Sequence, residues 1–337
     1  MGRPPTKKYH KNMNDAYLKG TLTCLSSNYV KNNINTDFPI IMNIEPTNHC
    51  DLHCYLCSRK KAIDLGKKKL GHMDFNLYKK IIDECSKYRK LTMLNLHKDG
   101  ESLLHPRIFD MIRYAKMMDV AESIHMNTNG VALNKKNAYK FLLSGIDDVT
   151  FSIDAARAES FKKIKGKNVL DKVEKNIIKL IDYRNDIGLV EPYVRVKIME
   201  FSDISKDEIN EFFDKWRDVA DEVQVTGAHN WSGSVDVVAT DETLDIDCPC
   251  PLVWYSLAIN WDGRASICSV DWDCATVVGD VNNSSIHKIW NGEKIKKMRS
   301  LELYNRDKRP KTCKECVLWS CVGNMQEFFS SKKEFLP

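Results

Sequence analysis

The sequence of 337 residues contains no long apolar run. Lys, Asp and Asn interrupt each apolar stretch well before the ~20 residues needed to cross a bilayer, so no membrane span is expected. The basic first residues precede no apolar segment of the kind found in secretory signals, which favours a cytoplasmic location. An excess of one charge is also missing, because 51 Lys and Arg stand against 46 Asp and Glu. Without a basic block, nucleic acid is not expected as a partner.

Cysteine is too sparse for a small domain held together by disulfides, since only 12 of the 337 residues are cysteine. In a reducing compartment, clustered cysteines are more often metal ligands or catalytic groups than crosslinks. Disorder of the whole chain is excluded, because 43% of the residues are apolar and can fill a sizeable core. The length predicts two domains, or one large barrel with an appendage.

Between residues 40 and 226, short apolar segments alternate with segments of helical period. The predicted strands are 40–45, 91–97, 122–127, 148–154, 193–200 and 222–226. The clearest helical patterns lie at 75–85, 108–118 and 169–181. Six such units predict an α/β fold with a parallel sheet, either doubly wound or a partial (βα)6 TIM-like barrel. In both folds the ligand lies at the carboxyl ends of the strands.

This alternation ends after residue 226. The segment 227–247, which starts GAHNWSGSVD, is interpreted as a linker between a barrel at 39–226 and a C-terminal domain at 248–337. Residues 1–38 form a polar N-terminal extension. Asp262-Gly263 favours a tight turn, so a β-hairpin of 257–261 and 264–268 is predicted. A helix is predicted at 286–301.

Three cysteines, Cys50, Cys54 and Cys57, follow the first predicted strand within eight residues. Thiolates on one loop can converge on one metal centre, and Cys is a ligand of both zinc and iron–sulfur clusters. A structural zinc site needs a fourth ligand, which His49 or His53 could supply. Otherwise, the three thiolates leave one metal position open for a substrate or cofactor.

This loop resembles the signature loop of the radical S-adenosylmethionine (SAM) enzymes, in which gaps of three and two residues separate the cysteines. The resemblance implies that the three thiolates hold a four-iron, four-sulfur cluster whose fourth iron binds SAM. Cleavage of SAM then gives a 5'-deoxyadenosyl radical that abstracts a substrate hydrogen. The family usually has an aromatic residue before the third cysteine. Here Leu56 occupies that position and Tyr55 precedes it, and both are assigned to the cofactor site.

Segments at later strand ends resemble other parts of the family's SAM site. Asp99-Gly100-Glu101-Ser102 is similar to the Gly-Gly-Glu-Pro motif that binds the SAM amino group, with departures at the first and last positions. Further on, the chain has a turn similar to the family's Thr-Asn-Gly turn, a segment similar to one that touches the SAM ribose or carboxylate, and a lysine where many relatives have arginine. The SAM contacts implied by the resemblance are Gly100, Glu101, Asn127, Asn129, Ser152, Asp154 and Lys165.

Cys250, Cys268, Cys313 and Cys316 form a second set, around the hairpin and in a Cys-x-x-Cys turn. A closed four-cysteine site suits zinc or an iron–sulfur cluster. The surrounding segment resembles the C-terminal extension of the SPASM and twitch enzymes, which carries auxiliary four-iron clusters. Two such clusters need about eight ligands, so one auxiliary cluster is expected here. The other cysteines are Cys248, Cys274 and Cys321, near this set, and Cys24 and Cys85, which are interpreted as buried thiols.

Among relatives with a single auxiliary cluster are dehydrogenases that oxidise a hydroxyl of a sugar or aminocyclitol. The resemblance therefore implies a radical SAM oxidoreductase that acts on a hydroxylated small molecule, with a flavodoxin or ferredoxin as electron donor. Such an oxidation needs a base at a strand end. The candidates are His97, Arg195, Lys197, Glu200 and His229.

Three alternatives stay open. An epimerase would return hydrogen to the substrate radical from a thiol, with Cys248, Cys274 or Cys321 as the donor. An enzyme of the SPASM type could instead modify a peptide. Outside the enzymes, both cysteine sets could be zinc sites that stabilise a binding protein.

Overall fold

The computed structural model describes residues 37–227, 230–235 and 249–316. Its centre is a nine-stranded sheet with the strand order β6-β5-β4-β3-β2-β1-β7-β8-β9. Neighbouring strands from β1 to β6 are all parallel, and the sheet keeps two edges, β6 and β9. The predicted partial barrel is confirmed. The first six strands are β1 (Ile41–Ile44), β2 (Leu91–Asn95), β3 (Ala121–Thr128), β4 (Asp148–Ser152), β5 (Tyr193–Glu200) and β6 (Glu222–Gly227).

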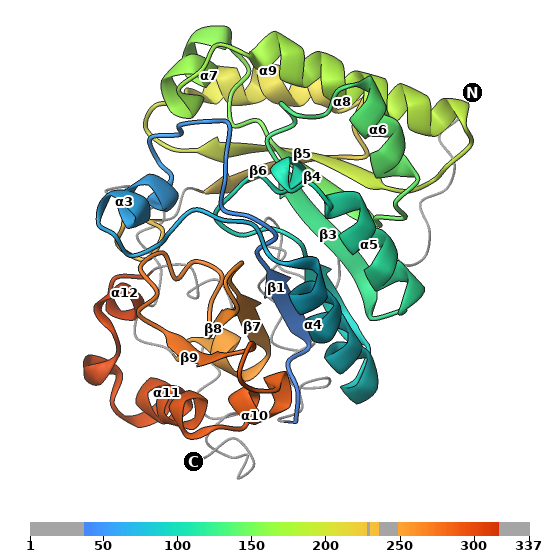
Figure 1. Ribbon diagram of the computed structural model, residues 1–337. Helices are drawn as coiled ribbons and strands as arrows, with labels where there is room; N and C mark the ends of the chain where they lie inside the picture. The colour runs from blue at the N-terminus through green and yellow to red at the C-terminus, as the bar shows by residue number, and fades with distance from the viewer. Residues whose placement is uncertain (1–36, 228–229, 236–248, 317–337) are drawn as a thin grey trace.

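Helices connect these strands, and most of them lie along the outside of the curved sheet (Figure 1). Polar side chains begin several of them: Asp74 accepts hydrogen bonds from the first backbone N–H groups of α4, and Ser205 does so for α9. The connecting helices are α3 (Ser58–Asp64), α4 (Phe75–Tyr88), α5 (Ile108–Met117), α6 (Lys135–Leu142), α7 (Ala158–Lys165), α8 (Leu170–Asp186) and α9 (Lys206–Trp216). On α4, Cys85 is fully buried in the core, as predicted, whereas Cys24 lies outside the described residues.

The two faces of the sheet differ in chemistry because side chains alternate along each strand. Residues such as Leu94, Ile124 and Val149 belong to the hydrophobic core. The other face has a row of buried polar side chains in register across four strands, each aligned with the next. This row is Asn43, Asn95, His125 and Asp148. The polar face therefore surrounds the interior of the partial barrel.

The C-terminal segment continues the same sheet (Figure 1). Strand β7 (Ser256–Ile259) pairs with β1 in parallel, and it forms the predicted antiparallel hairpin with β8 (Arg264–Ser266). A further strand, β9 (Val277–Asp280), was not predicted. Within the described residues, no helix combines the length and apolarity needed to cross a membrane.

The predicted helix 286–301 is wrong in one respect, because it is two helices, α10 (Ile286–Trp290) and α11 (Glu293–Tyr304). The side-chain amide of Asn291 donates to the His287 carbonyl and closes α10. A Cβ atom on Gly292 would lie 2.9 Å from the Lys288 carbonyl oxygen, so this tight break needs glycine. A short helix, α12 (Lys311–Lys314), follows and carries Cys313.

Candidate functional site

The three-cysteine loop lies at the carboxyl end of β1, and Cys57 immediately precedes α3. Two backbone hydrogen bonds tie the loop to the end of α7: His53 N–H to the Lys165 carbonyl at 3.1 Å, and Tyr55 N–H to the Ile164 carbonyl at 3.2 Å. The thiols of Cys50, Cys54 and Cys57 are partly exposed and form no disulfide.

Burial raises the pKa of Cys50 to about 12 and that of Cys57 to about 11, and the nearby Arg59 opposes both shifts. These thiols hold their protons at neutral pH unless a metal displaces them. A set of soft, unpaired donors on one loop fits a three-thiolate cluster site.

The loop after β2 packs directly on the cysteine loop. A Cβ atom on Gly100 would lie 2.3 Å from the Thr47 carbonyl oxygen, and the Glu101 N–H donates to the His49 carbonyl at 2.8 Å. Residue 100 must therefore be glycine for the two loops to meet.

Glu101 then points toward the loop after β3. Its carboxylate accepts from Asn129 N–H at 2.7 Å, Thr128 Oγ1 at 2.8 Å and Leu103 N–H at 3.1 Å. Burial raises its pKa to about 7 despite these bonds. An acid of this kind can ionise in response to a bound cation.

Asn129 connects the cysteine loop to β3, because its Nδ2 donates to Asp51 Oδ1 at 2.8 Å and lies 3.9 Å from Cys50 Sγ. Asp51 is a site residue that the sequence analysis missed, and its position inside the Cys50–Cys54 gap is the signal that could have revealed it.

At the end of β4, Asp154 has a positive φ of 59° and binds Lys165 Nζ at 2.6 Å. Its other carboxylate oxygen is buried and has no hydrogen-bond partner among the described residues. Such an atom can accept a hydrogen bond from a bound ligand. The residues predicted to bind the cofactor at positions 100, 101, 129, 154 and 165 thus lie around the cysteine loop.

The remaining predicted cofactor residues lie in other surroundings. Leu56 is buried in the hydrophobic core, while Tyr55 is exposed and donates to Asp203 Oδ2 at 2.5 Å. Ser152 is aligned with Lys197 on β5. Asn127 contacts His97 instead of the cysteine loop.

Two of the candidate bases are held by protein groups. Arg195 donates to Asp148 Oδ1 at 2.7 Å and to Glu222 Oε2 at 2.8 Å. His97 accepts from the Asn127 N–H at its Nδ1 atom, at 3.2 Å, and its other ring nitrogen faces the Asn127 side-chain amide at 3.1 Å. Neither ring nitrogen of His97 is left for a substrate.

Lys197 differs from these two residues. In the part of the chain that the structure describes, its ammonium group has no hydrogen-bond or ion-pair partner, although it lies on the polar face of β5 near Asp154 and Lys165. Burial lowers its pKa, and the positive charge of Lys165 acts in the same direction, while Asp154 opposes it. Glu200 ends β5 and is half-buried, whereas His229 lies outside the described residues.

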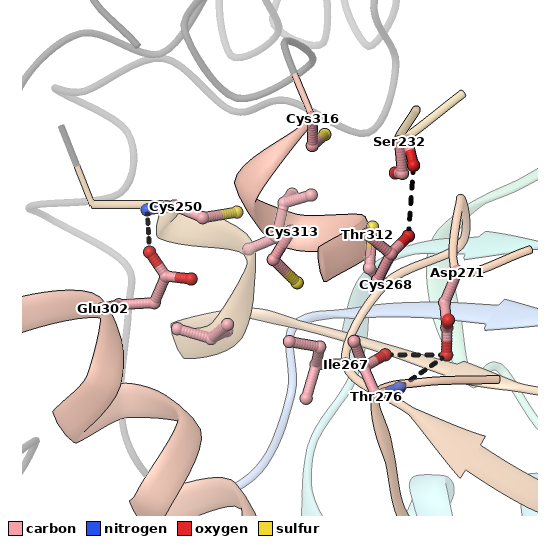
Figure 2. A pocket seen from close by; sticks show the side chains of 12 residues that line it. Ser232, Cys250, Ile267, Cys268, Asp271, Thr276, Glu302, Thr312, Cys313 and Cys316 are labelled. Atoms are coloured by element: carbon pink, nitrogen blue, oxygen red, sulfur yellow. Dashed lines mark hydrogen bonds between the residues drawn. The ribbon is translucent and has the colours of Figure 1, made fainter. Parts of the chain in front are cut away.

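The four cysteines of the second set line one cavity, together with Glu302 and Asp271 (Figure 2). They come from the segment before β7, from the loop after β8, and from α12 with the residues that follow it. Burial raises the pKa of the Cys268 thiol to about 12, and the neighbouring Cys316 adds to this shift. Four cysteines that line one cavity supply the number of ligands that a closed four-thiolate site needs.

Of the other cysteines near this site, Cys274 is among the described residues, and it does not line the cavity. Cys274 has a positive φ of 59° and follows Cys268 on the same loop. Cys248 and Cys321 lie outside the described residues. One backbone group at the cavity is held by a carboxylate, since Cys250 N–H donates to Glu302 Oε2 at 3.0 Å.

Among characterised proteins, a tungsten-containing aldehyde ferredoxin oxidoreductase cofactor-modifying protein of Pyrococcus furiosus is 30% identical over 156 residues, which are 46% of this chain and 42% of that protein. A GTP 3',8-cyclase of Staphylococcus haemolyticus is 26% identical over 212 residues, which are 61% of this chain and 60% of the cyclase. The chain thus spans about half the length of the curated relatives that it matches.

Solved structures with the same fold include BtrN in complex with AdoMet and 2-DOIA, with a TM-score of 0.56, 15% identity, and coverage of 83% of this chain and 93% of BtrN. Streptococcus suis SuiB bound to the precursor peptide SuiA has a TM-score of 0.64 and 14% identity, and covers 91% of this chain and 76% of SuiB. At these identities the likeness shows the fold alone.

Comparison with models of protein families identifies the family of this chain. The radical SAM superfamily model matches residues 44–215, which is half of the chain, and the SPASM iron-sulfur cluster-binding domain model matches residues 248–317. The cofactors that go with these families are SAM and a four-iron, four-sulfur cluster for residues 44–215, and auxiliary iron–sulfur chemistry for residues 248–317. This family assignment favours iron–sulfur clusters over zinc at both cysteine sets. The chain belongs to the radical SAM superfamily and carries a C-terminal SPASM domain.

Proposed function

We propose that this protein is a radical SAM oxidoreductase that oxidises a hydroxyl of a sugar- or aminocyclitol-type small molecule to a ketone. The observation that carries this proposal is that, within the described residues, Cys250, Cys268, Cys313 and Cys316 line one cavity. One closed site of four thiolates favours one auxiliary cluster, as in the dehydrogenases that the sequence resembles. When bound, SAM and the clusters supply the 5'-deoxyadenosyl radical that removes the carbinol hydrogen and an acceptor for the remaining electron.

The proposed cofactor site uses the loops that meet around Gly100. Cys50, Cys54 and Cys57 would hold the catalytic cluster. The buried Glu101 carboxylate would face the SAM amino group, because a cation favours the ionised form of this acid. The unpartnered oxygen of Asp154 would accept a hydrogen bond from the cofactor, while Lys165 neutralises this carboxylate.

Lys197 is the proposed base. Removing a hydrogen atom and an electron from a carbinol leaves the hydroxyl proton, which a nearby amine can accept. Lys197 lies on the polar face of β5, and burial favours its neutral form. The rival candidates on this face are engaged: Arg195 in two ion pairs, and His97 with Asn127.

The proposed electron donor is a small acidic carrier such as a flavodoxin or ferredoxin. Exposed lysines flank the cysteine loop on two sides, from α3 and from α7. Lysines near the catalytic cluster favour encounter with an acidic carrier, although Asp64 and Asp203 pair with Lys60 and Lys163. These lysines are Lys60, Lys61, Lys162 and Lys163.

The test is deuterium transfer under anaerobic conditions. Candidate sugars and aminocyclitols with deuterium at single carbinol carbons are incubated with the enzyme, SAM and a reductant. Oxidation gives deuterated 5'-deoxyadenosine and one ketone for each labelled substrate consumed. An inverted alcohol that carries solvent hydrogen would instead show an epimerase, and transfer from peptides alone would show a peptide-modifying enzyme. Either outcome would contradict the proposal.

A further inference from the structure

Four charged side chains are buried together at the carboxyl ends of β1 and β2. The side chains of Lys68, Lys98 and Asp99 are 3%, 0% and 4% exposed, and Glu45 is fully buried. Asp99 occupies the first position of the segment that resembles Gly-Gly-Glu-Pro, where the family has glycine. The network therefore includes one of the two positions at which this segment departs from that motif.

The contacts of this network join the ends of β1 and β2 and the loop with Lys68 to two C-terminal residues, Trp261 and Asp271. Asp99 Oδ2 binds Lys98 Nζ at 3.0 Å and also binds Lys68 Nζ. Both ammonium groups donate to the main-chain carbonyl of Asp271, Lys68 at 3.0 Å and Lys98 at 3.4 Å. Glu45 accepts from the N–H groups of Asp99 at 3.4 Å and Trp261 at 3.1 Å.

These contacts place the network between the two cysteine sites. On one side, Asp99 directly precedes Gly100 and Glu101, which pack on the first cysteine loop. On the other side, Asp271 lies three residues after Cys268, and its side chain lines the four-cysteine cavity. Asp271 also binds Thr276 Oγ1 at 2.8 Å and the Ala275 N–H at 3.0 Å, so the loop that follows Cys268 is fixed as a unit.

The charges of the network act on both sites. Lys98 and Lys68 bring two positive charges to the loop that carries Cys268, because both donate to its Asp271 carbonyl. Asp99 brings a negative charge to the first cysteine loop, because the adjacent Gly100 and Glu101 pack on that loop. Asp99 itself stays ionised, since Lys98 and Lys68 outweigh the effect of burial and lower its pKa to about 2.

Stability alone does not account for such a network. Buried ion pairs stabilise a fold little compared with apolar side chains of similar size, because removing the charges from water is costly. A fixed charge beside a redox centre has a direct effect instead. Positive charge stabilises the reduced, more negative form of a cluster, and negative charge destabilises it.

We propose that Lys68, Asp99 and Lys98 are positioning residues. They fix the loop that carries Cys268 against the loop after β2, which contains Gly100 and Glu101, and their charges set the reduction potentials of the two clusters. Lys98 and Lys68 favour the electron on the auxiliary cluster, and Asp99 disfavours it on the catalytic cluster. This inference rests on the proposed function for its use in oxidation. Its test reads potentials and not turnover, so the two proposals fail separately.

The auxiliary cluster is tested in the full chain with Cys54→Ala, which leaves this cluster alone to be titrated. Its midpoint potential is measured by redox titration followed by electron paramagnetic resonance. Adding Lys98→Met is expected to shift the potential downward, and Lys68→Met should act in the same direction. Lys67→Met is the matched control, because Lys67 is an exposed lysine beside Lys68 and should leave the potential unchanged.

The catalytic cluster is tested with Asp99→Asn in the otherwise intact chain. Removal of this negative charge is expected to shift the potential of that cluster upward, opposite in sign to the lysine variants. A general loosening of the protein would not produce opposite shifts at two clusters. Unchanged potentials in Lys98→Met and Asp99→Asn proteins with full iron content would overturn the proposal, as would shifts of the same sign. If Lys98→Met loses its cluster, Lys68→Met and the charge-preserving Lys98→Arg decide the result.

Discussion

Because Gly100 has no Cβ atom, the loop after β2 can pack directly against the cysteine loop. Gly100→Ala would place a Cβ atom 2.3 Å from the Thr47 carbonyl oxygen and 2.6 Å from Asn48 Cα, and both are backbone atoms. We expect a loss of SAM cleavage and a destabilisation of about 1–3 kcal/mol, typical of overpacking. Thermal unfolding and 5'-deoxyadenosine formation measure the two effects. Gly227→Ala is the control, because a Cβ atom there meets nothing within 4 Å. Equal behaviour of the two variants would contradict this reading of the loop contact.

Replacement of Lys197 should separate SAM cleavage from ketone formation. Lys197→Met removes the proposed base but leaves the cysteine loop and Glu101 intact. Ketone formation should fall by roughly 100-fold or more, as for other lost general bases, while SAM cleavage continues without product. Liquid chromatography of ketone and 5'-deoxyadenosine gives both rates. Lys175→Met, on the exposed side of α8, should change neither rate. A Lys197→Met enzyme with normal ketone formation would remove Lys197 from the mechanism.

At the scale of elements, Asp148 links three strands of the polar face. It binds His125 Nδ1 on β3 and Arg195 on β5, both at 2.7 Å. Burial disfavours its charge, but Arg195 and His125 outweigh this effect and lower its pKa to about 2. Because the pKa is lower in the folded state than in the unfolded state, Asp148 stabilises the fold fully above about pH 4. This contribution is lost as the pH falls from about 4 to about 2.

Asp148→Asn should therefore destabilise the protein by about 3 kcal/mol at pH 7, because it leaves Arg195 with a buried, poorly compensated charge. Urea unfolding of the anaerobically purified protein measures this loss, which should be unchanged at pH 5. Asp182→Asn, an exposed position on α8, serves as the reference and should stay within about 0.5 kcal/mol of wild type. A loss that disappeared between pH 7 and pH 5 would show that the carboxylate of Asp148 is not held by these partners.

Local patterns were enough to predict the barrel. The predicted strand 193–200 coincides with β5, and the apolar period starting at Phe75 marks α4. Pairings between distant segments left no such local signal. Strand β7 pairs with β1 from far along the chain, so the sequence alone predicted a hairpin but not its place in the main sheet.

In the candidate site, too, local motifs could be predicted and contacts between distant residues could not. Cysteine spacing and the Gly100-Glu101 pair predicted the loops that meet. The partners of buried charges were not predictable, because Lys68 reaches Asp99 and Asp271 only in the folded chain. The roles of the strand-end candidates depended on similar contacts, since nothing in the sequence indicated that Asn127 would occupy both ring nitrogens of His97.

For the whole molecule, one continuous sheet supports both cysteine sites. The first site follows β1, and the second contains Cys268, which follows β8 and is connected to β1 through β7. The ligand sets themselves do not overlap: Cys50, Cys54 and Cys57 come from one loop, and none of them lines the four-cysteine cavity. The two sites thus share one sheet, but each has its own set of cysteine ligands.

The independence of the two ligand sets predicts the metal content of Cys54→Ala. Loss of one of three thiolates should empty the catalytic site, whereas the closed four-thiolate site keeps all its ligands. Iron and sulfide should fall from about eight to about four of each per chain, and SAM cleavage should stop. Cys85→Ala is the matched control, because this thiol is buried in the core on α4 and should leave the metal content unchanged. Loss of all iron from the Cys54→Ala protein would mean that the shared sheet, and not the separate ligand sets, decides whether either cluster is retained.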